Sequence, residues 1–106
     1  PLLGHLFETA VVLEHLKWGS ITGTADRFSY FRTKDGIEVD VLIEQGIELI
    51  AREIKSSRTQ TTFTTKNLHR AEQLLHRPLH KTILAPVEKP LLMNGVTVKP
   101  WQAVAW

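Results

Sequence analysis

Two short segments place carboxylates and a lysine where the surrounding pattern predicts buried strand. Asp40 lies in an alternating apolar stretch over residues 37–44, and Glu53 and Lys55 end a largely apolar stretch over residues 47–55. Acidic groups on strands that build a core cost free energy unless something binds them. Carboxylate oxygens suit Mg²⁺, which polarises a phosphodiester and lowers the pKa of its bound water. Lys55 adds a positive charge suited to phosphate. A divalent metal held for phosphodiester cleavage is therefore the most specific candidate for these residues, beside the alternative of a solvated sheet face.

A hairpin between the two stretches would bring these groups together. We expect its two-residue turn at residues 45–46, where Gly46 supplies the positive φ. In that register Asp40 lies opposite Ala51 and diagonal to Glu53, on the face that also carries Lys55. A slip of one residue would place Asp40 and Glu53 on opposite faces.

Periodicity and turn signals predict the remaining elements. We expect a mixed sheet flanked by helices, an α/β fold in the order α-β-β-β-α-β, because the third strand, second helix and fourth strand form a crossover. Pro100 is expected at the first position of a last helical turn. The expected elements are a helix over 3–18, strands over 28–33, 37–44 and 47–55, a polar loop over 56–67, a helix over 68–77 with Asn67 as its N-cap, a strand over 82–85, a turn at 94–95 before a strand over 96–98, and helical structure over 100–106.

Length and composition set outer limits on the fold. The 106 residues are expected to form a single domain, 1–106, with a formal net charge of +2 and no cysteine. Disulfides and thiolate metal sites are therefore excluded. No apolar run is long enough to span a membrane and no secretory leader is present, so we expect a cytoplasmic protein. Because the chain begins at Pro1 without Met, we expect it to be part of a longer protein.

The element order, with Glu in the first helix, Asp in the second strand and Glu-x-Lys in the third, resembles the PD-(D/E)XK nuclease superfamily. The segments "LFETAVVLEHL", "FRTKDGIEVDVLIE", "EIKSS" and "NGVTVKPW" are similar to the C-terminal nuclease-like domain, of unknown function, of a family of prokaryotic AAA-type ATPases. The resemblance covers nearly the whole chain. It implies a restriction-endonuclease-like core with the active centre at one sheet edge, and an ATPase portion N-terminal to this domain.

The resemblance also implies roles for individual residues. In active superfamily members the residues matching Asp40 and Glu53 bind Mg²⁺ or Mn²⁺, and the main-chain carbonyl matching Ile54 adds a ligand. The residue matching Lys55 orients the attacking water or neutralises the transition state. The residue matching Glu8, on the first helix, completes the acidic cluster. Glu8 is equally consistent with an exposed helix position, although apolar residues share its helix face.

Polar residues beside the proposed centre suit phosphate oxygens without reading a base sequence. Phe63 has two interpretations, stacking on a base or anchoring its loop on the core. Gln73 on the second predicted helix is expected to face the centre, as polar helix residues do in some superfamily members. The expected nucleic-acid contacts are Ser56, Ser57, Arg58, Lys66 and Gln73, and the alternative for the first four is a solvated surface loop.

Two further interpretations do not need catalysis. The domain can be an adaptor that docks on its own ATPase portion, with Trp101 and Trp106 covered by that neighbour, or it can be a homodimerisation module. Asp40 and Glu53 are then charges of a solvated sheet face. Arg32 is expected to pair with Glu38 if the turn at residues 34–36 is a three-residue loop, whereas other turns move it along the strand or to the far side.

Overall fold

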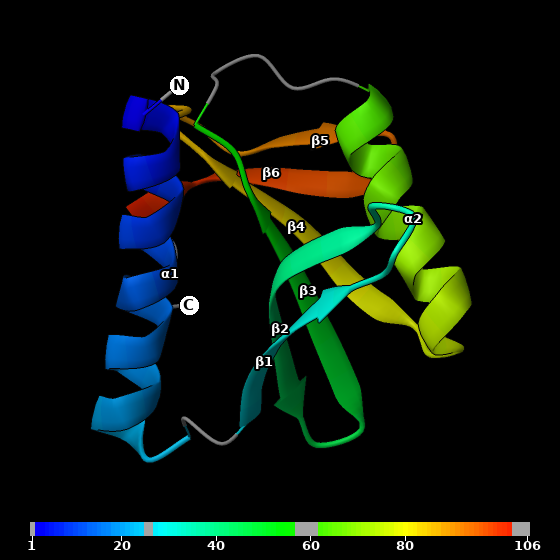
Figure 1. The fold of residues 1–106 in the computed structure, drawn as a ribbon, viewed down its shortest axis with the longest axis horizontal. Helices are drawn as coiled ribbons and strands as arrows, with labels where there is room; N and C mark the ends of the chain where they lie inside the picture. Colours follow the sequence, from blue (N-terminus) through cyan, green and yellow to red (C-terminus); the bar gives the residue numbers. More distant parts are fainter. Residues whose placement is uncertain (1, 25–26, 57–61, 103–106) are drawn as a thin grey trace.

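The computed structural model describes residues 2–24, 27–56 and 62–102, which form a six-stranded sheet with one helix on each face (Figure 1). The order of strands across the sheet is β1-β2-β3-β4-β6-β5. Strands β3, β4 and β6 run parallel, and the other neighbouring pairs are antiparallel. The elements are α1 (Leu2–Thr22), β1 (Phe28–Arg32), β2 (Glu38–Gln45), β3 (Glu48–Ile54), α2 (Thr62–Leu75), β4 (Leu79–Ala85), β5 (Leu91–Met93) and β6 (Val96–Pro100).

The predicted mixed sheet, its element order and the parallel β3-α2-β4 crossover are confirmed. No described helix is both long enough and apolar enough to cross a membrane. Each face of the sheet carries its own apolar cluster, because strand side chains alternate between faces. The α1 side contains Val11, Val41, Ile43, Ile54 and Leu84. The α2 side contains Ile37, Val39, Leu42, Leu49, Ala51, Leu68, Ala71, Leu79, Ile83, Ala85, Val96 and Val98.

The β2–β3 turn differs from its prediction by one position. The turn residues are Gly46 and Ile47, and Gln45 pairs with Glu48. Gly46 has a φ of 64°, as the first central residue of a type II′ turn requires. Ile47, a strong strand former, is 95 % exposed at the second position. The predicted register was therefore wrong by two residues. A shift of two leaves the paired residues 41–45 and 48–52 on their predicted faces.

A β-bulge interrupts β2 where it pairs with the edge strand β1. Ser29 pairs with Leu42 and Phe31 pairs with Val39, so Asp40 and Val41 together lie opposite the single residue Tyr30. Val39 and Leu42 consequently share the α2-side cluster, although regular alternation would place them on opposite faces. Bulges redirect side chains and occur beside active sites. This bulge lies at Asp40, the residue proposed from the sequence as a metal ligand.

Helix α2 begins six residues before its predicted start, so the prediction of a loop over 62–67 was wrong. Asn67 lies inside the helix and donates from Nδ2 to the main-chain oxygen of Glu38 (3.2 Å), so it is not the N-cap. The run of threonines had suggested loop because Thr has weak helix propensity. Burial of Thr65 and Leu68 against the sheet outweighs that propensity. The helix ends before His76, which adopts a φ of 55°.

Other boundaries also differ from the sequence prediction. Helix α1 extends to Thr22 instead of ending at Trp18, and β4 begins at Leu79 instead of Thr82. The Asn94-Gly95 turn is confirmed, but it connects two strands, because the exposed segment β5 was not predicted. Pro100 ends β6 and does not begin a helix, and the last described residues, 101–102, lie in a 3₁₀ turn. Residues 103–106, including Trp106, lie outside the described part.

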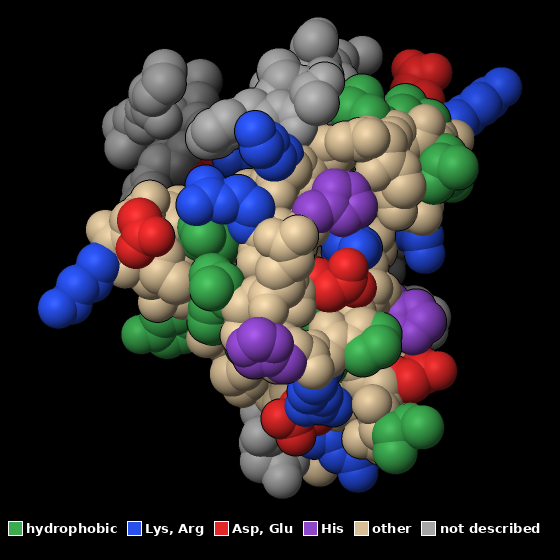
Figure 2. Space-filling view, turned by 90° about the vertical axis from the view of Figure 1, so that its right-hand side faces the viewer, with side chains coloured by type: hydrophobic (Ala, Val, Ile, Leu, Met, Phe, Trp, Pro, Cys, Tyr) green, Lys and Arg blue, Asp and Glu red, His purple; other side chains and the backbone are tan. Residues whose placement is uncertain are grey.

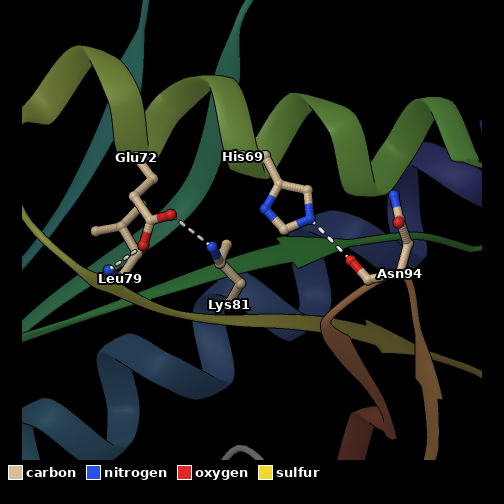
Figure 3. A network of polar contacts seen from close by, with 5 residues as sticks. All are labelled: His69, Glu72, Leu79, Lys81 and Asn94. Carbon is tan, nitrogen blue, oxygen red and sulfur yellow. Dashed lines mark hydrogen bonds and ion pairs between the residues drawn. The ribbon is translucent and has the colours of Figure 1, made fainter.

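Polar contacts attach α2 to the sheet (Figure 3). The Glu72 carboxylate accepts from the amide of Leu79 (2.8 Å) and from Nζ of Lys81 (2.7 Å). Three residues earlier in the helix, Nε2 of His69 lies 2.8 Å from the main-chain oxygen of Asn94. These contacts fix α2 over β4 and over the β5–β6 turn. Figure 2, which views the molecule from this side, shows positive and negative side chains interspersed over the surface.

Candidate functional site

The antiparallel ladder of β2 and β3 is continued by a side chain at the end that carries the candidate residues. The last backbone pair is Val41 with Arg52. Beyond it, Oδ2 of Asp40 accepts a hydrogen bond from the amide of Ile54 at 2.8 Å. The carboxylate thus takes the place of a main-chain acceptor. Continuing the register by one position also places Asp40 opposite Glu53, a closer relationship than the predicted diagonal one.

Glu53 is a buried carboxyl in contact with Asp40. Its side chain lies near the end of β3 and the residue is 4 % exposed. Burial raises the pKa of Glu53 to about 9, and both the side-chain hydrogen bond with Asp40 and the charges of Asp40 and Glu38 add to this rise. Burial therefore favours the protonated form of Glu53, and its hydrogen bond with Asp40 links the two carboxyls.

Lys55 follows directly after β3 and belongs to the same group. The positive charge of Lys55 acts to lower the pKa of Glu53, although burial outweighs it. The main-chain amide of Lys55 donates to the oxygen of Leu84 at 2.9 Å, which holds the segment against β4. Ile54 between them is buried, and Ser56 after them is half-buried. The structure therefore gathers Asp40, Glu53 and Lys55 at one end of the β2–β3 hairpin.

Glu8 is not gathered with these residues into a three-carboxylate group. It lies half-buried on α1, and among the described residues no set of three or more His, Asp or Glu side chains is arranged to hold a metal ion. The immediate donor set of the centre is the pair Asp40 and Glu53, with Glu38 close enough for its charge to affect Glu53.

The expected nucleic-acid contacts lie in different places. Lys66 and Gln73 are both exposed on α2, and Gln73 lies on the helix side opposite the buried Thr65, Leu68 and Ala71. Gln73 therefore faces solvent. Ser57 and Arg58 lie outside the described residues, as does the side chain of Phe63.

The predicted ion pair between Arg32 and Glu38 is confirmed. Nε of Arg32 lies 3.1 Å from Oε1 of Glu38, and the two residues pair across β1 and β2. Thr33 and Ile37 are linked by a main-chain bond of 2.9 Å, so residues 34–36 form the three-residue loop. Both charged side chains remain substantially open to solvent. An exposed pair of this kind contributes little to stability.

Sequence reasoning missed a second buried polar contact, between α1 and β3. Nη1 of Arg52 lies 3.0 Å from Nε2 of His15, and Nδ1 of His15 lies 2.8 Å from the oxygen of Val11. Burial lowers the pKa of His15 to about 4, so its ring is neutral, with Nδ1–H donating to Val11 and Nε2 accepting from Arg52. Strand alternation could have indicated this contact, because Arg52 and Glu53 are neighbours on β3 and must point to opposite faces of the sheet. Arg52 therefore needed a polar partner on the other face.

Asp40 also forms part of a surface hollow of about 370 Å³, here called the Tyr30 hollow. A second hollow, of about 220 Å³, adjoins it and shares Val12, Tyr30 and Asp40. The centre is therefore reached from solvent along β1 and α1. The Tyr30 hollow is lined by Val12, Tyr30, Phe31, Arg32, Glu38, Val39 and Asp40.

The arrangement can bind a cation or move a proton. Two adjoining carboxyls cannot both be charged cheaply in a buried site, so one of them holds a proton until a positive charge replaces it. Lys55 supplies a further positive charge at the same place. Such a site suits stabilisation of negative charge on an oxyanion.

Comparison with known proteins identifies a family for the chain and no function. No curated protein and no solved structure gives a significant match to the chain. The family model described as "Domain of unknown function (DUF4143)" matches residues 3–104, which is nearly the whole sequence and includes the complete β2–β3 hairpin. The chain therefore belongs to the DUF4143 family.

Proposed function

We propose that this domain is a divalent-metal-dependent phosphodiester hydrolase acting on nucleic acid, of the PD-(D/E)XK type, with its centre at Asp40, Glu53 and Lys55. One observation carries the proposal: the buried carboxyl of Glu53 contacts Asp40 and has a pKa raised to about 9. A carboxyl pair that serves only the fold has no need of this costly arrangement. Strongly perturbed carboxyls beside a hollow are typical of functional sites.

The residues fit a hard divalent cation such as Mg²⁺ or Mn²⁺. Asp40 and Glu53 offer carboxylate oxygens, which these ions prefer, and a cation would relieve the repulsion that keeps Glu53 protonated. Two carboxylates leave positions open for substrate oxygens and water, as a catalytic site requires. In this proposal the main-chain oxygen of Ile54 adds a ligand, and Glu8 lies outside the immediate donor set.

Each residue of the proposed centre then has a distinct role. The bound cation would supply Lewis acidity and a lowered pKa for water. Asp40 is held in place by its hydrogen bond from the Ile54 amide. Glu53 must release its proton when the cation binds. Lys55 places its ammonium beside the carboxyls and balances the charge that develops on the phosphate.

Nucleic-acid cleavage by the 106-residue chain with Mg²⁺ or Mn²⁺ tests the proposal. We expect Lys55→Ala to lower the rate by about 10²- to 10³-fold, the usual effect of removing one charge-stabilising group, and to retain metal binding. Lys17→Ala is the matched control, because Lys17 is an exposed lysine of α1. Equal rates for Lys55→Ala and wild type, or no metal-dependent cleavage above background, would reject hydrolysis by this centre.

A second candidate function rests on a different observation. Helix α1 is apolar on its outer side as well, where Leu6, Leu13, Leu16 and Ile21 are exposed. Exposed apolar side chains along one helix suit a protein contact. They favour an adaptor that docks on an N-terminal ATPase portion, or a homodimer. Sedimentation of the chain, with Leu13→Glu as the variant, tests self-association, and a monomer at all concentrations would exclude the homodimer.

A further inference from the structure

The most exposed aromatic side chain of the described residues stands at the candidate centre. Tyr30 is 74 % exposed on the edge strand β1, although an aromatic ring in water forgoes the free energy of burial. It lines the Tyr30 hollow together with Asp40. A planar ring beside a hollow presents a surface on which another planar group can stack.

The β-bulge explains why the ring and the carboxylate share one hollow. Because Asp40 and Val41 together lie opposite Tyr30, the regular alternation of β2 is broken at Asp40. Asp40 consequently lines both the Tyr30 hollow and the adjoining hollow, while Oδ2 still accepts from Ile54. A group stacked on Tyr30 therefore lies next to the proposed centre.

Arg32 supplies the charge that such a ligand would need. Arg32 lines the same hollow, its Nε lies 3.1 Å from Oε1 of Glu38, and 67 % of the Arg32 side chain is exposed. Because this ion pair is so exposed, another anion can readily replace Glu38 as the partner of Arg32. A guanidinium binds phosphate through two parallel hydrogen bonds. The hollow thus combines a stacking surface, a phosphate-binding cation and a carboxylate of the centre.

From this combination we infer that the Tyr30 hollow takes an unstacked nucleobase, with the neighbouring phosphate at Arg32, so that the substrate is single-stranded or locally unpaired nucleic acid. The inference rests on the proposed hydrolysis for its substrate class. A base inside a duplex is already stacked on both faces and cannot reach Tyr30 without leaving the helix. The preference for single strands is therefore a property of this hollow, separate from the chemistry of Glu53 and Lys55.

Binding without cleavage tests the inference. A short single-stranded oligonucleotide carrying a fluorescent base is titrated with the 106-residue chain in chelator, and the affinity is compared with that for the same sequence as a duplex. We expect Tyr30→Ala to weaken single-strand binding by about 5- to 150-fold, the range for loss of one base–aromatic contact. Tyr30→Phe should keep wild-type affinity, because it keeps the ring. Ile47→Ala is the control, since Ile47 is exposed at the distant β2–β3 turn.

Cleavage with Mg²⁺ separates the two proposals. If wild type binds single strands through Tyr30 and never cuts, the nucleobase site is supported and the proposed hydrolysis is rejected. If wild type cuts, and Tyr30→Ala has the same affinity and KM as wild type, hydrolysis is supported and the nucleobase site is rejected. Duplex binding as tight as single-strand binding, or no oligonucleotide binding by wild type, also overturns the inference. Because Tyr30 is exposed, unchanged thermal unfolding of Tyr30→Ala is expected and confirms that the variant is folded.

Discussion

Arg52 of β3 donates from Nη1 to Nε2 of His15 on α1, 3.0 Å away, and both residues are buried. The contact depends on a neutral imidazole, because the acceptor nitrogen of His15 would carry a proton in the charged ring. Burial and the neighbouring charge of Arg52 both lower the pKa of His15, and the bond to the Val11 carbonyl does not offset them. A polar contact thus links the helix to the strand that carries Glu53.

Breaking this contact is expected to destabilise the fold. His15→Leu leaves the Arg52 guanidinium without its imidazole acceptor, at a cost of about 1–3 kcal/mol in the free energy of unfolding. The double variant His15→Leu/Arg52→Met should recover much of the loss, because apolar replacement of a buried polar pair is often tolerated. Urea unfolding of both single variants and the double variant measures the coupling. Strictly additive effects would contradict a direct interaction.

The pH dependence of stability should reveal the raised pKa of Glu53. A carboxyl whose pKa is 4.5 when unfolded and about 9 when folded binds more protons in the folded state between these values. Its contribution to stability is complete below pH 4.5 and is lost as the pH rises towards 9. Glu53→Gln cannot ionise, so it should flatten this part of the profile and be more stable than wild type at pH 8. Parallel profiles for the two proteins in chelator would refute the raised pKa.

Metal addition should stabilise wild type and not Asp40→Asn. A cation that binds only the folded chain adds about 2.7 kcal/mol at a hundred times its dissociation constant. Asp40→Asn keeps the shape and an oxygen for the Ile54 amide but removes a charged ligand, so it should be more stable than wild type in chelator and gain little from Mg²⁺ or Mn²⁺. Asp35→Asn, in the exposed β1–β2 turn, is the matched control. Thermal melts with chelator and with metal make the comparison, and a metal-insensitive wild type would count against the site.

Glu72 should stabilise the α2–β4 contact only while its carboxylate is charged. Its bonds from the Leu79 amide and from Lys81 lower the pKa of Glu72, so the stabilisation is present above pH 4.5 and is lost as the pH falls through the folded value. Glu72→Gln should cost about 1 kcal/mol at pH 7, less than a fully buried charged bond because solvent screens this pair. The difference in urea midpoints should shrink as the pH falls below 4.5 and Glu72 becomes protonated. A difference that does not change with pH would assign the effect to packing.

Local sequence signals located strands β2 and β3 correctly but misplaced the turn between them. The alternation over residues 37–44 located β2, whereas the β2–β3 turn depended on whether Gly46 takes the first or the second central position. A dipeptide containing one glycine permits both, and the prediction placed Gly46 at the second position, whereas the structure has it at the first. Because the register error was an even number of residues, Asp40 and Glu53 still come into contact, although the bulge breaks the alternation that the prediction assumed at Asp40.

Long-range effects account for what the sequence did not reveal. The bulge at Asp40 arises from pairing with β1, and β5 exists only because β6 provides its partner. The early start of α2 depends on burial of Thr65 against the sheet, which no helix-propensity argument contains. The contact between His15 and Arg52 joins residues 37 positions apart, so neither position alone marks it.

The bond from the Ile54 amide to Asp40 joins residues only 14 positions apart, within one hairpin. Closing so short a loop costs little chain entropy, whereas pairing β3 with β4 must first order the α2 crossover. The candidate centre should therefore persist through partial openings of the molecule that detach β5 and β6. Hydrogen exchange at the Ile54 amide would then proceed more slowly than exchange in the peripheral strands, and it would report how long the carboxylate pair stays assembled.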